Sequence, residues 1–147
     1  MKRNLNPCFL LMAFVMIIAV GCSKDDDDPG GSIENLLSFF SNSYEELVNG
    51  VPNNIRFLLN ATDIDSTKGS GKISAREVDT DYELAGGFNR LEVELSYLTD
   101  EQRGEDNGPR AGRTYKGKLD TLAQPNALIR MVNTGNAGDS LVLRKEG

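Results

Sequence analysis

The chain has 147 residues and a formal net charge of −6. Because phosphate backbones repel a negatively charged protein, this charge argues against a nucleic-acid-binding role. The chain contains neither His nor Trp, and the lack of His excludes a Ser-His-Asp triad, a Cys-His pair and an imidazole metal site.

The N-terminal residues 1–21 have the three parts of a secretory signal peptide. A basic start precedes a 12-residue apolar run, 9–20, which ends beside the small residue Gly21. A membrane-spanning helix needs roughly 20 apolar residues, so a cleaved signal peptide is the better interpretation. Removing residues 1–21 takes away two basic residues. It leaves 126 residues with 14 Lys+Arg against 22 Asp+Glu, a net charge of −8.

Val20, Gly21 and Cys22 resemble the lipidation site of bacterial lipoproteins, although Ala19 stands where Leu is commonest. The resemblance implies that the mature chain begins at Cys22, which carries acyl chains such as palmitate and anchors the protein in the outer membrane. Cys8 leaves with the signal peptide, so an acylated Cys22 leaves no thiol for catalysis or zinc. The alternative is plain secretion, in which Cys22 would be an unpaired thiol, an unusual feature outside the cytoplasm.

The acidic stretch Ser23–Asp28 resembles the export signal of surface lipoproteins in Bacteroidota-type bacteria. The resemblance implies display on the outward face of the outer membrane. The same stretch is also typical of a solvated spacer, since like charges repel and extend a linker. With the glycines that follow, it predicts a tether over residues 22–32 and a single globular domain over residues 33–147.

Residues 33–48 carry apolar side chains at spacings of three and four, the period of an amphipathic helix. Ser32 is placed to cap its start, and Gly50 and Pro52 end the pattern. The polar centre Ser41-Asn42-Ser43 divides the segment, so two short helices are an alternative.

After Pro52 the apolar period changes to two, which predicts strands. The clearest alternation is 90–97, whose odd-numbered residues are all apolar or aromatic. Gly86-Gly87 predicts a turn or bulge, and Asn133–Asp139 a hairpin turn. Further strands are predicted at Ile55–Ala61, Lys72–Val78, Asp81–Ala85, Thr114–Leu119, Leu128–Asn133 and Leu141–Lys145.

These elements predict an α+β fold, with the N-terminal amphipathic helix packed on an antiparallel sheet of five to seven strands. The alternative is a small all-β barrel or sandwich with one capping helix. The polar segment Thr99–Arg113 predicts a long loop that is either functional or mobile.

The segment Asp63–Glu77 resembles part of a calcium-binding EF-hand loop. Its second half, Gly71–Glu77, matches the closing half of such a loop, but the segment has 15 residues where the EF-hand loop has 12. If it binds Ca²⁺, the expected carboxylate ligands are Asp63, Asp65 and Glu77. The alternative is a glycine-rich hairpin turn in which Asp and Ser serve turn chemistry. No other cofactor is expected.

Three Asp-Ser/Thr triplets resemble the O-glycosylation acceptor pattern of the same bacterial group. Their acceptors would be Ser66, Thr121 and Ser140, although a motif of three residues also matches by chance. Glu92 and Glu94 alternate on one strand and predict a solvated sheet face, not a catalytic carboxylate pair.

No catalytic constellation emerges from these residues. We therefore expect an outer-membrane, surface-anchored lipoprotein that acts as a non-enzymatic binding or accessory module of the cell envelope, with an unidentified protein or glycan partner. Two alternatives stay open, a carboxylate-dependent hydrolase and an inhibitor or immunity-type protein with one protein partner. Acids or tyrosines that converge in a pocket would favour the hydrolase, whereas an open polar surface would favour the binding module.

Overall fold

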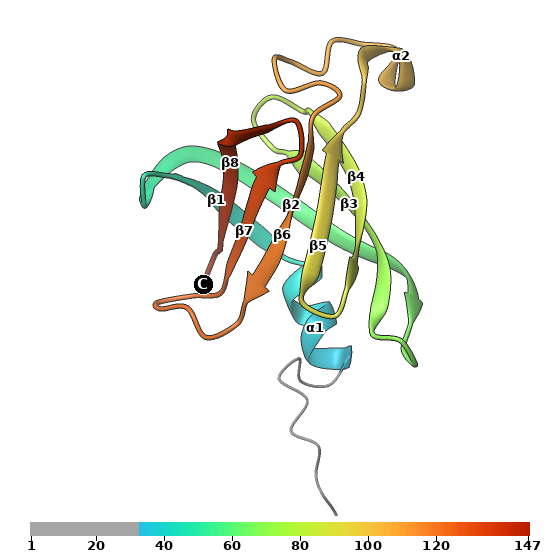
Figure 1. Cartoon of the computed structure of the whole chain (residues 1–147), viewed down its shortest axis with the longest axis vertical. Helices are drawn as coiled ribbons and strands as arrows, with labels where there is room; N and C mark the ends of the chain where they lie inside the picture. The colour runs from blue at the N-terminus through green and yellow to red at the C-terminus, as the bar shows by residue number, and fades with distance from the viewer. Residues whose placement is uncertain (1–32) are drawn as a thin grey trace, which may run out of the picture.

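The computed structural model describes residues 33–147. Eight antiparallel strands form a closed barrel in which each strand pairs with the next and β8 pairs with β1 (Figure 1). Helix α1 (Ile33–Phe40) precedes the barrel, and the short helix α2 (Asp100–Arg103) lies between β5 and β6. The strands are β1 (Ser43–Val48), β2 (Val51–Asp65), β3 (Ser70–Glu77), β4 (Glu83–Asn89), β5 (Glu92–Tyr97), β6 (Thr114–Asp120), β7 (Leu128–Asn133) and β8 (Asn136–Lys145).

The expected α+β fold with an open sheet was wrong, and the alternative barrel with one capping helix is confirmed. Each predicted strand overlaps an observed one, and alternation of apolar and polar residues describes the wall of a barrel as well as an open sheet. The difference lies in one pairing. Tyr44, Glu45 and Glu46 of β1 pair with Lys145, Arg144 and Leu143 of β8, a contact between the two ends of the domain that no local pattern encodes.

The predicted helix over residues 33–48 is half correct. Helix α1 ends at Phe40, where the polar centre of the segment begins, and Asn42 donates a side-chain hydrogen bond back to the Ser38 carbonyl. The second half is strand β1, which pairs with β2 on one side and β8 on the other. These two sets of backbone partners outweigh the weak helical pattern, because tertiary context routinely overrides helix propensity.

The barrel interior is filled by apolar side chains, and α1 closes one end. Phe57, Leu95 and Ile129 are fully buried within it. Phe40 of α1 stacks on Phe88 of β4 with ring centroids 4.4 Å apart, and burial of one such side chain stabilises a fold by about 1.5–3 kcal/mol. A barrel of eight strands is just wide enough for side chains to fill.

The predicted turn or bulge at Gly86-Gly87 was wrong, since β4 runs through both glycines in unbroken register with β3 and β5. Gly86 and Gly117 lie where neighbouring backbones approach closely. A Cβ at Gly86 would lie 1.9 Å from the Glu94 carbonyl oxygen, and one at Gly117 would lie 1.7 Å from the Arg130 carbonyl oxygen. These glycines allow the sheet to bend tightly enough to close.

The two ends of the barrel differ. Helix α1 and the turns 66–69, 90–91 and 121–127 form one end, which we call the helix end (Figure 1). The turns 49–50, 78–82 and 134–135 and the segment 98–113 form the opposite end, which we call the loop end. Within residues 33–147, no helix combines the length and hydropathy needed to cross a membrane.

Candidate binding site at the loop end of the barrel

Two glutamates project into the barrel interior at the loop end. Glu46 of β1 is 1% exposed and Glu77 of β3 is 4% exposed. Both lie at inward positions of their strands, where the neighbouring inward residues are apolar or aromatic. Burying an isolated carboxylate is costly unless it is paired and hydrogen-bonded, so each of these groups requires a partner.

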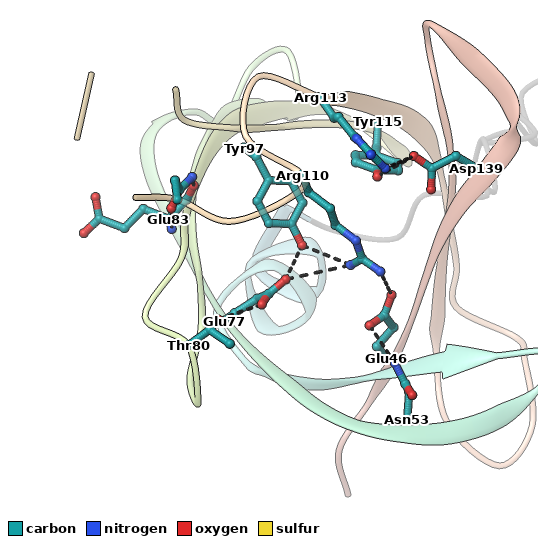
Figure 2. A network of polar contacts seen from close by, with 11 residues as sticks. Glu46, Asn53, Glu77, Thr80, Glu83, Tyr97, Arg110, Arg113, Tyr115 and Asp139 are labelled. Carbon is teal, nitrogen blue, oxygen red and sulfur yellow. Dashed lines mark hydrogen bonds and ion pairs between the residues drawn. The ribbon is translucent and has the colours of Figure 1, made fainter. Parts of the chain in front are cut away.

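Arg110, from the segment 98–113, places its guanidinium between the two carboxylates (Figure 2). Its Nη2 lies 2.7 Å from Oε1 of Glu46, and its Nη1 lies 3.8 Å from Oε1 of Glu77. Nη1 also donates to the Tyr97 hydroxyl at 3.2 Å, with the guanidinium carbon 5.9 Å from the ring centroid. Burial disfavours the charged form of the guanidinium and by itself would lower the pKa of Arg110. The hydrogen bonds with Tyr97 and Glu46 outweigh this effect and raise the pKa above its usual value.

Further side chains complete the coordination of the two carboxylates. Asn53 donates to Oε2 of Glu46 at 3.3 Å, and Thr80 donates to Oε2 of Glu77 at 2.7 Å. The Tyr97 hydroxyl donates to Oε1 of Glu77, and burial together with this bond raises the pKa of Tyr97. Throughout residues 33–147, no buried side-chain nitrogen or oxygen lacks a hydrogen-bond partner. The network is therefore a satisfied ion cluster whose phenol stays protonated at neutral pH.

A second polar cluster joins β6, β7 and β8 at the same end. One oxygen of Asp139, Oδ2, accepts from Arg113 at 2.9 Å, from Tyr115 at 2.8 Å and from Asn133 at 2.8 Å. Burial alone would raise the pKa of Asp139, but the hydrogen bonds from Asn133, Tyr115 and Arg113 lower it below its usual value. The cluster fixes the start of β8 against β7 and against β6 beyond it.

Segment 98–113 is fastened to the barrel at several points. Within the segment, Thr99 and Gln102 form a reciprocal capping box around α2, which stabilises the start of a helix. Arg103 donates from the segment to the Asp81 carbonyl of the β3–β4 connection. Asn107 is fully buried; its side chain donates to the carbonyls of Glu83 and Leu98 and accepts from the Glu83 amide. These contacts count against the mobile alternative for this segment.

The wall of the barrel has an incomplete seam beside this network. Pairing between β1 and β8 ends at Glu46 and Leu143, so residues 136–142 of β8 have no partner on β1, and β7 pairs with Asn136 and with residues 140–142. A groove of about 670 Å³ opens between the two strands, and we call it the seam groove. Its lining includes Glu46, Val48, Arg110, Arg130, Ser140 and Arg144. The buried network is thus accessible from the side of the barrel through Arg110, whose side chain is 24% exposed.

Another groove, of about 650 Å³, lies along β4, β5 and β6. Ion pairs between Lys116 and Glu94 and between Lys118 and Glu92 flank it. All four of these side chains are exposed, in agreement with the predicted solvated face. This groove contacts none of the buried polar groups, which makes the seam groove the better candidate site.

The structure does not bring together the three carboxylates predicted to bind calcium. Asp63 pairs with Lys72 at 2.7 Å, and Asp65 pairs with Lys68 at 3.3 Å. Glu77 lies at the far end of β3, about 23 Å along a strand of this length. Residues 66–69 form the hairpin turn of the alternative interpretation. Among the residues that the structure describes, no three His, Cys, Asp or Glu side chains are grouped suitably for a metal ion.

The predicted modification sites lie on different parts of the molecule. Ser66 is exposed on the β2–β3 turn, Thr121 is half-buried in the turn after β6, and Ser140 is exposed on β8. Their glycosylation stays a prediction. Cys22, the signal peptide and the tether 22–32 lie outside the described residues.

The residues that form the buried network were not predicted from the sequence. Glu46 lies in the stretch 33–48 that was predicted to be helical, because β1 was not recognised as a strand. Arg110 lies in an irregular segment, where no periodicity shows the direction of a side chain. The one available signal was Glu77, which continues the inward series Ile73 and Ala75 along β3 and so marks a buried acid that needs a cationic partner.

Comparisons with protein-family models, with curated proteins and with solved structures find no significant match to this chain. The inference of function therefore depends on the geometry of the loop end.

Proposed function

We propose that the protein is a lipid-anchored module of the outer membrane that binds a partner through the loop end of its barrel. In this proposal Cys22 carries the anchor and residues 22–32 form the tether. The supporting observation is the polarity of the fold. Helix α1, the first element after the tether, closes one end of the barrel, while segment 98–113, the buried network and the seam groove lie at the other (Figure 1). The loop end would then face away from the membrane.

A carboxylate-dependent hydrolase is the second candidate, because Glu46, Glu77 and Tyr97 do converge around Arg110. The contacts within the cluster favour binding over catalysis. A catalytic acid or base must exchange a proton with a substrate, whereas the four carboxylate oxygens here are engaged by Arg110, Asn53, Tyr97 and Thr80. An inhibitor or immunity-type protein would be a binding module with a single, tightly bound protein partner.

The location is tested with a Cys22→Ala variant expressed in the native host. We expect the wild type in the outer-membrane fraction and the variant in a soluble fraction, because acyl chains supply the anchor. Retention of the variant in the membrane would place the anchor elsewhere. Protease treatment of intact cells then separates outward from periplasmic display.

The binding face is tested by capture from envelope extracts with two matched double charge reversals. Arg56→Glu with Arg76→Glu changes exposed cations beside the 78–82 turn at the loop end, and Lys68→Glu with Lys72→Glu changes exposed cations at the helix end. We expect the loop-end pair to abolish capture of the partner and the helix-end pair to leave it intact. The reverse pattern would place the binding face at the helix end and contradict the proposal.

A further inference from the structure

We propose that the seam groove binds an extended, acidic peptide segment of a partner protein, which adds as a strand to the open edge of β8. The inference rests on the proposed binding function and names the kind of partner. Its basis is the direction of the backbone groups of β8, the size of the groove and the charge around it.

The direction of the backbone groups follows from two hydrogen bonds near the end of β8. The Lys145 amide donates to the Ala127 carbonyl on the β7 side, and the Glu146 amide donates to the Ser43 carbonyl on the β1 side. In an antiparallel strand the amide and carbonyl groups of one residue point to the same side, and those of the next residue point to the opposite side. The register with β7 is unbroken from Arg144 to Ser140, so the backbone groups of Ser140 face the groove.

No residue of β1 pairs with Ser140, because the β1–β8 pairing ends at Leu143. Beyond this point β1 pairs only with β2, in the hairpin that ends at Asn49 and Gly50. In Figure 1 this hairpin leaves the barrel wall sideways, while the β7–β8 hairpin continues toward the loop end. The groove is therefore bounded by a strand edge whose amide and carbonyl groups match those of another strand.

The dimensions of this edge suit a short peptide. Residues 136–142 of β8 have no partner on β1, and 140–142 keep the regular register with β7. Strands rise about 3.3 Å per residue, which gives an edge of about 20 Å. An added strand of roughly four to six residues would cover this length.

The side chains around the groove indicate which peptide would bind. Val48 and Val51 are 46% and 63% exposed on the β1–β2 hairpin, and Val132, directly across from Ser140 on β7, is 45% exposed. These valines offer apolar contacts on both sides of the edge. Outward-facing residues of a strand added here would lie near them and near the arginines described next.

The groove lining holds three arginines against two acids, Glu46 and Asp139, although the protein as a whole is negatively charged. Arg130 is exposed on β7, and among the described residues it has no acidic partner within ion-pair distance. Arg144 donates to Glu45 at 2.6 Å, and Arg110 reaches the groove from the barrel interior. Opposite charge at an interface steers association and fixes register, so the outward-facing residues of the segment would include both acidic and apolar ones.

The test is a selection of linear dodecamer peptides displayed on phage against the domain 33–147 with its tether. The most enriched sequence is then synthesised, and its affinity and the amide hydrogen exchange of the complex are measured. We expect the residues at every second position of the peptide to be acidic or apolar, and exchange at the Ser140 amide to be slowed at least tenfold on saturation. We expect Ser140→Pro to weaken binding at least tenfold and the matched Ser140→Ala, which keeps the amide, to bind like the wild type.

Proline is suited to this test because it removes an amide that faces the groove and leaves the hydrogen bonds to β7 in place. If Ser140→Pro proves unfolded by circular dichroism, Arg130→Glu replaces it, with Lys72→Glu, exposed on β3 and outside the groove, as its control. The expected result is at least a tenfold loss of affinity for the first and no change for the second.

Three outcomes would overturn the inference. In the first, no peptide is enriched, and the wild type is a dimer whereas Ser140→Pro is a monomer. This result would assign the groove to a second copy of the chain. The second is an enriched peptide that protects amides elsewhere on the loop end, which would leave the proposed function standing without strand addition. The third is unchanged affinity in a folded Ser140→Pro variant.

Discussion

Arg110 and Glu46 are 64 positions apart in the sequence, yet the guanidinium donates a 2.7 Å hydrogen bond to a carboxylate that is almost completely buried. The pair joins an irregular segment to the first strand of the barrel. Because Glu77 and Tyr97 also contact Arg110, one side chain holds three strands and the segment 98–113 together. Stability and shape at the loop end therefore depend on the same residue.

Replacing Arg110 by Met should destabilise the domain by about 2–3 kcal/mol. Removing one partner of a buried pair typically costs 3–5 kcal/mol, and the partial exposure of Arg110 lowers this figure. Urea denaturation at pH 7 measures the loss. The control is Arg76→Met, which breaks an exposed ion pair with Asp81 and should cost less than about 1 kcal/mol. Equal losses in the two variants would show that the buried carboxylates do not need Arg110.

Strand positions could be read from the sequence because the barrel wall alternates buried and exposed residues along most of its length. Residues 128–133 were predicted with their observed bounds. Closure could not be read, because it depends on pairing between β1 and β8, segments that lie at opposite ends of the domain. Residues 43–48 were also ambiguous. Their inward side chains include Glu46, and a buried acid breaks the apolar alternation that marks a strand.

The site was harder to predict than the fold for a related reason. A buried charged cluster requires residues from several elements, and only the fold determines which acids meet which cations. Asp63 and Asp65 looked like metal ligands because they are close in sequence, but they pair with nearby lysines on a hairpin. Glu77 was grouped with them, although β3 carries it to the opposite end of the barrel.

Asp139 should make the stability of the domain sensitive to acid. Hydrogen bonds hold its pKa below the usual value in the folded state, so its contribution is present above the unfolded-state pKa of about 3.9 and is lost as the pH falls through the lower folded-state value. We expect the difference in unfolding free energy between the wild type and Asp139→Asn to be constant from pH 7 to pH 5 and to shrink below pH 4. Urea titrations across this range measure it, and a gap that does not change with pH would contradict the assignment.

Gly117→Ala should destabilise the barrel by about 3 kcal/mol or more, because the new methyl group would lie 1.7 Å from the Arg130 carbonyl oxygen and strand backbones cannot easily move apart. Gly135→Ala, in the β7–β8 turn, is the matched control. Its nearest atom would be 3.5 Å away, so its melting temperature should stay close to that of the wild type. A Gly117→Ala variant as stable as the control would mean that β6 and β7 do not approach as described.

Asn107→Ala should release segment 98–113 from the barrel. The substitution removes three hydrogen bonds to the backbone of Glu83 and Leu98, and each buried group left without a partner costs about 1–3 kcal/mol. Local opening exposes peptide bonds of the segment to a protease, whereas these bonds are protected while the segment is attached to the barrel. Trypsin should therefore cut after Arg103 or Arg110 much faster in this variant than in the wild type.

Exposed Asn89, on the opposite end of β4 from Glu83, provides the control for that experiment. Asn89→Ala changes the same residue type without touching segment 98–113, so its cleavage pattern should match the wild type. Mass spectrometry of the first fragments identifies the cut sites. If Asn107→Ala is cleaved no faster after Arg103 or Arg110 than Asn89→Ala, the other contacts of the segment, such as those of Arg103 with Asp81 and of Arg110 with Glu46, are enough to hold it, and Asn107 is not its principal fastening.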